Sequence, residues 1–291
     1  MAEITLLDGG MGQELVHRAG DKPTPLWSTQ IMIDRPGLVA EVHRDFTQAG
    51  ATVATVNSYA IHHDRLEGTG MEDSFSDLHA MALEEARTSG AARMAASIGP
   101  LGATYRADLH PDSDTAEALF GEIVDLLAPH CDLVLFESIA SVAQARDAMR
   151  AAKRTDKPVW LAFTVGDADG SVLRSGEPLA EALKSGHPDA VLINCSTPEA
   201  IPAGLAVLAD TGLPYGAYAN GFETITEGFL QDKPTVDALR VRKDFTPENY
   251  ADHVMAWVDA GATIVGGCCE VSPGHIAEIA RRLRAAGHTI V

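Results

Sequence analysis

Short apolar runs recur along the whole chain, and each is bounded by polar or turn-forming residues. Runs of this length that are rich in Val, Ile, Leu and Ala are typical of strands buried on both faces of a sheet. The pattern predicts eight strands, at Ile4–Leu7, Ala51–Val56, Arg93–Ile98, Asp132–Phe136, Val159–Val165, Ala190–Ile193, Tyr215–Ala219 and Ala262–Val265.

Longer segments with a helical spacing of apolar residues lie between these runs. Several begin with Pro in the first turn, or with Asp or Ser just before it, as helices commonly do. The pattern predicts eight helices, near Pro36–Ala49, Asp73–Ser89, Asp114–Pro129, Val142–Ala152, Pro178–Lys184, Pro198–Leu208, Pro247–Asp259 and Pro273–Ala286. Eight strand–helix pairs in this order predict a single (β/α)8 barrel, the TIM-barrel fold, over residues 1–291.

An open, doubly wound sheet is the structural alternative, and it would carry a Gly-rich phosphate loop after an early strand. The segment Asp8-Gly9-Gly10-Met11-Gly12 lacks the spacing of that loop, and no clear helical pattern follows it. We therefore favour the barrel. Two long loops are predicted after the first and seventh strands, at Gly9–Arg35 and Gly221–Thr246. In a barrel both lie on the catalytic face, where long loops commonly act as lids or binding loops.

Composition limits the classes of partner. A chain of 291 residues with 46% hydrophobic residues can build one large barrel with an extensive core. Lys and Arg number 22 against 41 Asp and Glu, which gives a formal net charge of −19. Because such a surface repels nucleic acid and anionic membranes, we expect small-molecule partners, no nucleic acid and no membrane. The protein is expected to be a monomer or a small homo-oligomer.

The N-terminal residues Met1–Thr5 do not begin a signal peptide, and no apolar stretch reaches the ~18 residues that a membrane span needs. Four cysteines in a chain of this length do not predict a disulfide framework. They are expected in a reducing cytoplasm, in metal-binding or catalytic roles. The sequence therefore predicts a cytoplasmic protein.

Three of the four cysteines come just after predicted strands. Cys195 follows the sixth strand, and the adjacent pair Cys268 and Cys269 follows the eighth after two glycines. Two neighbouring cysteines make a poor disulfide and a good pair of metal ligands. Three thiols at strand ends predict a three-cysteine zinc site with an open fourth position, which is typical of catalytic zinc. Cys131 instead precedes a strand and is predicted to pack in the core.

Other polar residues also stand at strand ends, and in a barrel these ends converge on one mouth. They are Asp8, Asn57, Glu137, Asn194 and Asn220. The carboxylates of Asp8 and Glu137 are candidate anchors for a ligand ammonium group. Asn57 and Asn194 are candidate substrate contacts, although Asn57 and Asn220 could instead satisfy the backbone of their loops.

Together these residues resemble the homocysteine S-methyltransferase family, which includes betaine–homocysteine and S-methylmethionine–homocysteine enzymes. The resemblance covers nearly the whole chain. It rests on Asp8-Gly9-Gly10-Met11-Gly12, Glu137, Val191–Cys195, and Gly266-Gly267-Cys268-Cys269 followed by Pro273-Gly274-His275-Ile276. It implies a (β/α)8 barrel that moves a methyl group from a cationic donor to the thiol of homocysteine, giving methionine.

The resemblance also implies roles for single residues. A Zn2+ ion would be bound by Cys195, Cys268 and Cys269. The amino and carboxylate ends of homocysteine would be held by Asp8, the backbone at Gly9 and Gly10, and Glu137. The thiolate is the reactive form of a thiol, and a bound metal ion stabilises it at neutral pH.

The methyl donor is predicted to lie near aromatic side chains, because aromatic faces attract methylated onium groups. Trp27, in the first long loop, and Tyr59, just past the second strand, are the candidates, and each could instead serve only in packing. The segment Asn57–Ala60 looks closer to betaine-using members, whereas the short C-terminus fits the compact S-methylmethionine enzymes better. The donor stays open among S-methylmethionine, betaine and other methylated sulfonium compounds.

Three alternatives remain. The acceptor could be another thiol or a selenol such as selenocysteine. The chain could be a zinc-binding or thiol-binding barrel without turnover, although such a site needs neither Asp8 nor Glu137. An aldolase-like enzyme is the weakest alternative, because it would place a Lys at a strand end and none of the eight predicted strands has one.

Overall fold

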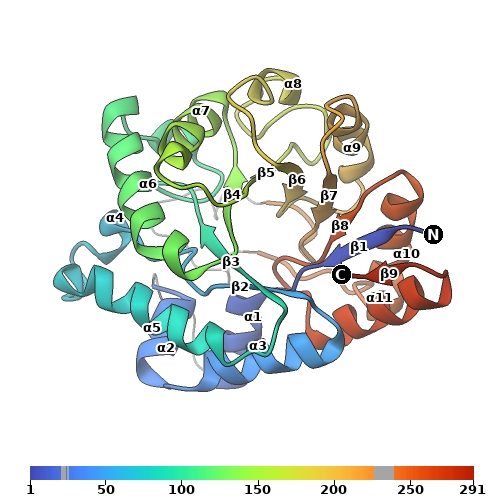
Figure 1. Cartoon of the computed structure of the whole chain (residues 1–291), viewed down its shortest axis with the longest axis horizontal. Helices are drawn as coiled ribbons and strands as arrows, with labels where there is room; N and C mark the ends of the chain where they lie inside the picture. The colour runs from blue at the N-terminus through green and yellow to red at the C-terminus, as the bar shows by residue number, and fades with distance from the viewer. Residues whose placement is uncertain (21–23, 25, 226–238) are drawn as a thin grey trace.

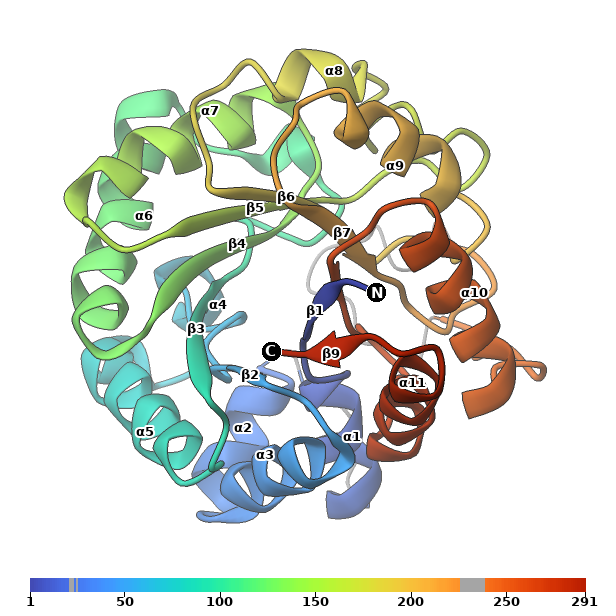
Figure 2. The same ribbon diagram turned by 45° about the vertical axis from the view of Figure 1, so that its right-hand side comes forward.

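A computed structural model describes residues 1–20, 24, 26–225 and 239–291. Its strands form one sheet in the order β2-β3-β4-β5-β6-β7-β8-β1-β9, with parallel pairing throughout. A parallel bridge between Leu7 and Val53 joins the end of β1 to β2 and closes the sheet into a barrel. Figures 1 and 2 show the helices around the outside of this ring. The predicted (β/α)8 barrel is confirmed.

The strands match the predicted runs to within a few residues, and β9 is additional. Their bounds are β1 Glu3–Leu6, β2 Val53–Thr55, β3 Arg93–Ile98, β4 Leu133–Ile139, β5 Val159–Phe163, β6 Ala190–Asn194, β7 Tyr215–Tyr218, β8 Ile264–Val265 and β9 Thr289–Ile290.

The α-helices are α1 Met11–Ala19, α2 Ser28–Asp34, α3 Leu38–Ala49, α4 His63–Leu66, α5 Phe75–Arg87, α6 Ser113–Leu127, α7 Val142–Ala151, α8 Leu179–Ala182, α9 Ile201–Ala209, α10 Pro247–Asp259 and α11 Pro273–Ala285. Short 3-10 turns lie at Glu72–Ser74, Ala107–Leu109, Ala128–His130 and Ala152–Arg154. No described helix combines the length and apolar character that crossing a membrane requires. The cytoplasmic location stays a prediction.

Polar side chains fix the start of several outer helices. Ser141 accepts a hydrogen bond from the backbone N–H of Gln144 at the start of α7, and Thr246 accepts one from Asn249 at the start of α10. Each bond satisfies a backbone donor that has no partner within the helix. These caps explain why the sequence located the outer helices well.

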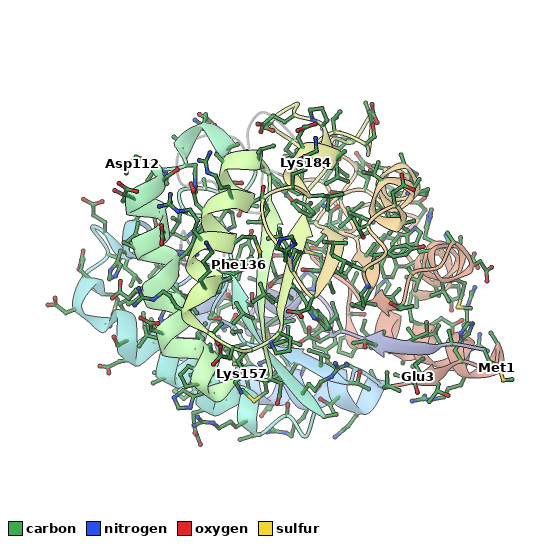
Figure 3. All side chains as sticks on the ribbon, turned by 45° about the horizontal axis from the view of Figure 1, so that its top comes forward. Met1, Glu3, Asp112, Phe136, Lys157 and Lys184 are labelled. Atoms are coloured by element: carbon green, nitrogen blue, oxygen red, sulfur yellow. A yellow bond between two sulfur atoms is a disulfide. The ribbon has the colours of Figure 1, made fainter. Side chains whose placement is uncertain are left out.

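The alternation of side chains along the strands builds two apolar layers. In β5, Trp160 and Ala162 belong to a cluster drawn from all eight barrel strands or their ends, which fills the barrel interior. Leu161 and Phe163 belong to the larger layer between sheet and helices. Phe136 in that layer is fully buried and lies inside the molecule in Figure 3. The filled barrel leaves its carboxyl-terminal mouth as the place for a site.

The predicted loop Gly9–Arg35 was wrong in part, because α1 and α2 lie within it. The apolar residues Met11, Leu15 and Val16 of α1 recur at helical spacing and are buried. Two glycines at the start of this segment hid that spacing in the sequence. Residues 226–238 of the other predicted loop, Gly221–Thr246, lie outside the described residues.

The C-terminal strand was also missed. Thr289–Ile290 pairs in parallel with β1. The backbone oxygen of Val291 accepts hydrogen bonds from Thr52, just before β2, and from Arg93, at the start of β3. These contacts place the C-terminus at the amino ends of the strands, opposite the mouth, so β9 does not shape the site.

Candidate active site

A cavity of about 550 Å³ opens at the carboxyl ends of the barrel strands. Every residue that we predicted for the site lines it, namely Asp8, Gly9, Gly10, Trp27, Asn57, Tyr59, Glu137, Asn194, Cys195, Cys268 and Cys269. The convergence of strand ends therefore brought together residues that are far apart in the sequence, as the barrel requires.

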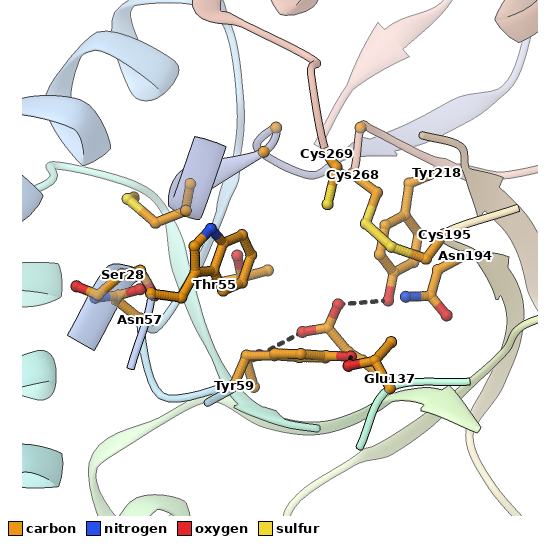
Figure 4. Close-up of a pocket in the computed structure, with 18 of the residues that line it drawn as sticks. Ser28, Thr55, Asn57, Tyr59, Glu137, Asn194, Cys195, Tyr218, Cys268 and Cys269 are labelled. Atoms are coloured by element: carbon orange, nitrogen blue, oxygen red, sulfur yellow. Dashed lines mark hydrogen bonds between the residues drawn. A yellow bond between two sulfur atoms is a disulfide. The ribbon is translucent and has the colours of Figure 1, made fainter. Parts of the chain in front are cut away.

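Three cysteines form one side of this cavity. The sulfur atoms of Cys195, Cys268 and Cys269 all lie within 4.8 Å of one another (Figure 4). Cys195 is buried, whereas Cys268 and Cys269 are partly exposed. Sulfur atoms this close, drawn from two strand ends, are suited to hold one thiophilic metal ion.

The structure joins Cys195 and Cys268 by a disulfide, while Cys269 stays free. This single pairing was not predicted from the sequence. Convergence on one point also brings two sulfurs within bonding reach, so the same geometry serves an ion or a disulfide. The sequence could not distinguish these two states. Burial raises the pKa of the free Cys269 thiol to about 12, so it is neutral at pH 7.

Backbone contacts hold the cysteines in place. Cys195 has a left-handed φ of 47°, and its carbonyl accepts a hydrogen bond from the Tyr105 hydroxyl at 3.1 Å. The N–H of Cys268 donates to the carbonyl of Ala219 at 2.9 Å. A Cβ on Gly267 would lie 2.0 Å from the Val271 side chain, so only glycine fits before the cysteine pair. The Tyr105 contact is one that the sequence did not reveal.

Backbone strain is concentrated at this cavity. In the described part of the chain, all non-glycine residues with positive φ line the cavity or directly follow a lining residue. They are Trp27, Tyr105, Ser138, Cys195 and Glu270. Left-handed backbone is unfavourable for such residues and persists where the surroundings impose it, often at functional sites.

Glu137 projects into the cavity from β4. Ser97 donates a hydrogen bond to its Oε1, and the Tyr218 hydroxyl donates to its Oε2 at 2.9 Å (Figure 4). Burial raises the pKa of Glu137, and the two hydrogen bonds oppose that rise. Its carboxyl is therefore fixed in position. Neither Ser97 nor Tyr218 was predicted, because each is polar in an otherwise ordinary strand.

Asn194 lines the cavity and makes internal hydrogen bonds, and its contact with the substrate stays a prediction. Its Oδ1 accepts from the backbone N–H of Ser138 at 2.9 Å, and its Nδ2 donates to the Ser138 hydroxyl at 3.0 Å. The residue is completely buried. Asn194 thus braces the backbone just after Glu137, where Ser138 has a φ of 56°.

Asp8 is the second buried carboxyl at the cavity. Its two oxygens accept hydrogen bonds from the backbone N–H and the hydroxyl of Thr55, both at 2.8 Å. Burial raises the pKa of Asp8 to about 8, and the negative charge of Glu137 adds to the rise. His43 lies 3.9 Å from Asp8, but burial lowers its pKa to about 3, so it supplies no positive charge.

The two glycines after Asp8 differ. The N–H of Gly10 donates to the carbonyl of Val271 at 2.8 Å, so this amide is used inside the protein. The role of the Gly10 backbone in holding a ligand stays a prediction, and its N–H already has a partner in the protein. A Cβ on Gly10 would lie 2.5 Å from the Cys268 carbonyl, so glycine is needed here for packing against the cysteine segment.

Two aromatic side chains line the cavity, and Figure 4 shows Tyr59 apart from the three cysteines. The rings of Trp27 and Tyr59 meet edge to face with centroids 6.4 Å apart. Trp27 Nε1 donates to Gln13 Oε1 at 3.1 Å, and Gln13 in turn donates to Glu270 at 2.6 Å. A hydrogen-bonded chain therefore links the indole to the cysteine segment. Tyr59 is held by a hydrogen bond between its hydroxyl and Thr104 at 2.9 Å.

Asn57 lies beside these rings and is almost fully buried. Its Nδ2 approaches the carbonyl of Ser28 at 3.5 Å and the sulfur of Met32 at 3.9 Å. Both contacts are long, so the structure places Asn57 at the cavity wall without a strong partner for its amide among the described residues.

Comparisons with known proteins agree with this geometry. The family model described as "Homocysteine S-methyltransferase" matches residues 5–283. The chain belongs to the homocysteine S-methyltransferase family. A relative of that name from Escherichia coli (strain K12) is 31% identical over 315 residues, covering 96% of this chain and 95% of the relative. A "Selenocysteine methyltransferase" from Astragalus bisulcatus is 27% identical and covers 93% and 90%.

Solved structures of the homocysteine methyltransferase MmuM from Escherichia coli are similar across 96% of both chains. The metallated form has a TM-score of 0.78 at 27% identity, and the oxidized form has a TM-score of 0.77 at 26%. The predicted family, fold and enzyme class are therefore confirmed. The three-sulfur cluster of this homocysteine S-methyltransferase family member is the place where its residues fit a metal ion.

Proposed function

We propose that this protein transfers a methyl group from a cationic small-molecule donor to the thiol of homocysteine, giving methionine, with a zinc ion bound by Cys195, Cys268 and Cys269. One observation carries the proposal. The three sulfur atoms lie within 4.8 Å of one another and line the same cavity as two buried carboxyls. Membership of the homocysteine S-methyltransferase family supports it.

The donor set fits zinc. Cys195, Cys268 and Cys269 would hold the ion through three sulfur atoms that lie within 4.8 Å of one another, and thiolates are common zinc ligands. Two of the three sulfurs are joined in the structure, so the disulfide between Cys195 and Cys268 must be reduced first. Zinc, when bound, would lower the pKa of the substrate thiol so that it reacts as a thiolate at neutral pH.

The protein's own groups would orient the acceptor. Asp8, just after β1, and Glu137, in β4, line the cavity, and both can accept hydrogen bonds from the homocysteine ammonium group. An incoming ammonium would favour the ionised form of Asp8, whose pKa burial raises to about 8. Of the two predicted backbone donors, Gly9 is assigned the substrate carboxylate, because the Gly10 N–H is already used by Val271.

The aromatic side would receive the donor. The faces of Trp27 and Tyr59 attract a methylated sulfonium or ammonium centre. The thiolate sulfur attacks the methyl carbon, a new carbon–sulfur bond forms, and the bond to the onium atom breaks with its electron pair leaving on the donor. The donor therefore departs as a neutral thioether or amine. Holding both substrates in line can supply ~7–11 kcal/mol of the barrier reduction.

A selenol acceptor is the second candidate. Relatives named selenocysteine methyltransferase and selenocysteine Se-methyltransferase are 27% and 28% identical to this chain. A selenol would occupy the same position as the thiol and react in the same way.

The direct test is a panel of acceptors and donors. Reduced, zinc-loaded protein would be given homocysteine or selenocysteine with S-methylmethionine or betaine, and the methylated products would be quantified. We expect methionine from homocysteine with at least one donor, and no product after stable removal of the metal. Undiminished activity in a metal-free preparation would contradict the zinc mechanism, and binding without turnover would identify a thiol-binding barrel.

A further inference from the structure

One basic residue at the cavity has no part in the roles above. Arg65 is on α4, which follows β2, and it lines the cavity. Among the described lining residues it is the only Lys or Arg, whereas Asp8, Asp64 and Glu137 are acidic. A chain with a net charge of −19 has thus placed a single cation in a cavity that already holds acidic groups.

The guanidinium of Arg65 lacks an anionic partner within the described residues. Its Nε and Nη2 atoms are buried and make no hydrogen bond there. The neighbouring Asp64 instead accepts a hydrogen bond from the backbone N–H of Gly102 at 3.1 Å. Buried guanidinium donors without an acceptor are unfavourable, so this group is suited to an anion that arrives with a ligand.

Arg174 makes the contrast clear. It lies over the ring of Tyr105, 4.9 Å from the centroid, and its Nη2 and Nη1 donate to both oxygens of Asp167 at 2.5 and 3.1 Å. Arg65 lies over the ring of Tyr59 in a similar way, 5.7 Å from the centroid, but has no such carboxylate among the described residues. Stacking on a tyrosine ring therefore does not prevent an arginine from pairing with a carboxylate. The lack of such a partner for Arg65 among the described residues is specific to its position at the cavity.

The location of Arg65 identifies the ligand part that it would meet. Its guanidinium lies beside Tyr59, and Tyr59 is in edge-to-face contact with Trp27. An onium group held by these rings therefore lies next to Arg65. A donor that carries only positive charge would be repelled by the guanidinium, whereas a donor with its own carboxylate would place an anion between the two cations.

We propose that Arg65 binds the carboxylate of the methyl donor. The proposal rests on the methyl transfer proposed above. It makes Arg65 a residue that determines donor specificity, and it excludes onium compounds without an acid group as good donors. Arg65 has no role in holding homocysteine.

The experiment compares two donors that differ only at the carboxylate, S-methylmethionine and its carboxamide. Methionine formation from homocysteine is measured for the wild type, Arg65→Gln and Arg65→Lys, with saturation curves for both substrates. Arg87→Gln is the control, because Arg87 is a half-exposed arginine on α5 that is paired with Glu84. Charge-assisted, bidentate contacts are strong enough that their loss should cost roughly 10- to 100-fold in kcat/KM.

We expect the wild type and Arg87→Gln to prefer the acid over the amide by that factor. Arg65→Gln should lose the preference by using the acid less well, and its saturation by homocysteine should be unchanged. Arg65→Lys should keep part of the preference, because it retains the charge without the planar fork. A preference that survives Arg65→Gln, no preference in the wild type, or an effect mainly on homocysteine saturation would each overturn the proposal.

Failure of the underlying reaction gives a different result. If the wild type forms no methionine from either compound, the proposed methyl transfer is wrong. Calorimetric binding of the same acid and amide to the wild type and Arg65→Gln then decides the role of Arg65 by itself. Selective loss of affinity for the acid in the variant supports a carboxylate site, and equal affinities in both proteins exclude one.

Discussion

The two sides of the cavity are built in different ways. On the sulfur side, Cys195, Glu137 and Asp8 stand in strands or directly after them, and internal hydrogen bonds hold their side chains or backbone. On the aromatic side, Trp27 and Arg65 are carried by segments that connect strands to outer helices. Groups that must align a reacting atom thus stand on the rigid sheet, whereas groups that would select the donor stand where chains vary most readily.

The largest effect is expected on the sulfur side. Cys268→Ala removes one of three metal ligands, so the bound zinc and the activity should both fall to background. Metal content by mass spectrometry and methionine formation measure the two losses. Cys131→Ala is the matched control, because Cys131 is buried in the core away from the cavity. Full activity in the Cys268 variant would remove that cysteine from the mechanism.

Glu137→Gln should keep the metal and weaken the binding of homocysteine. The amide retains an acceptor for the Tyr218 hydroxyl but loses the charge that would pair with an ammonium group. Hydrogen bonds to charged groups contribute ~1.5–3 kcal/mol, so KM for homocysteine should rise roughly 10- to 100-fold. An unchanged KM, with zinc still at one ion per chain, would refute this role for Glu137.

Trp27→Ala should mainly weaken the binding of the methyl donor. Loss of a desolvated aromatic contact to an onium group costs ~2 kcal/mol, which corresponds to a rise of roughly 30-fold in the donor KM. The KM for homocysteine should change much less, because Trp27 contacts the ring of Tyr59, which Figure 4 shows apart from the cysteines. If the acceptor KM rises more than the donor KM, the division into two sides is wrong.

The smallest predicted effect is a pH dependence from Asp8. Its pKa is raised to about 8, so below that pH an ammonium ligand must displace a proton before it can pair with the carboxylate. Affinity for methionine, which has no thiol to titrate, should rise with pH from 6 to 8 and then level off. Asp8→Asn should bind more weakly and show a flat profile. Titration calorimetry at several pH values measures this, and a profile that persists in the variant would contradict it.

The contribution of Asp8 to the free energy of unfolding should change with pH in the opposite direction to its contribution to ligand affinity. A carboxyl whose pKa is raised by folding favours the folded state most below its ordinary pKa of 3.8, and that contribution is lost as the pH rises toward 8. Asn can accept from the Thr55 N–H and donate to the Thr55 hydroxyl. Thermal unfolding at pH 8 should therefore show Asp8→Asn to be at least as stable as the wild type.

The fold was predictable because the strand runs and the outer helix starts are local features. The helix α1 was missed because Gly10 and Gly12 interrupt the helical spacing at its start. Gly12 serves a distant contact, since a Cβ there would lie 2.2 Å from the Trp27 ring. The local composition therefore gave a wrong prediction for this segment, because a tertiary contact determines the residue at position 12.

The sequence predicted which residues line the cavity better than it predicted what each of them contacts. Positions at strand ends, or in the loops that follow them, identified every predicted residue as part of the cavity wall. The internal contacts of Asn194 and Gly10 could not be predicted, because their partners, Ser138 and Val271, are far away in the sequence. No pattern in the sequence reveals that the Arg65 guanidinium has no acid beside it among the described residues, or that the sulfurs of two strands approach closely enough to pair.

The central claim is that three cysteines hold one metal ion with room for the sulfur of the substrate. X-ray absorption at the zinc edge, on reduced and zinc-loaded protein, tests it most directly. We predict three sulfur neighbours and one lighter atom without substrate, and four sulfur neighbours after homocysteine is added. A site with fewer than three sulfur neighbours, or one unchanged by homocysteine at saturation, would contradict the account.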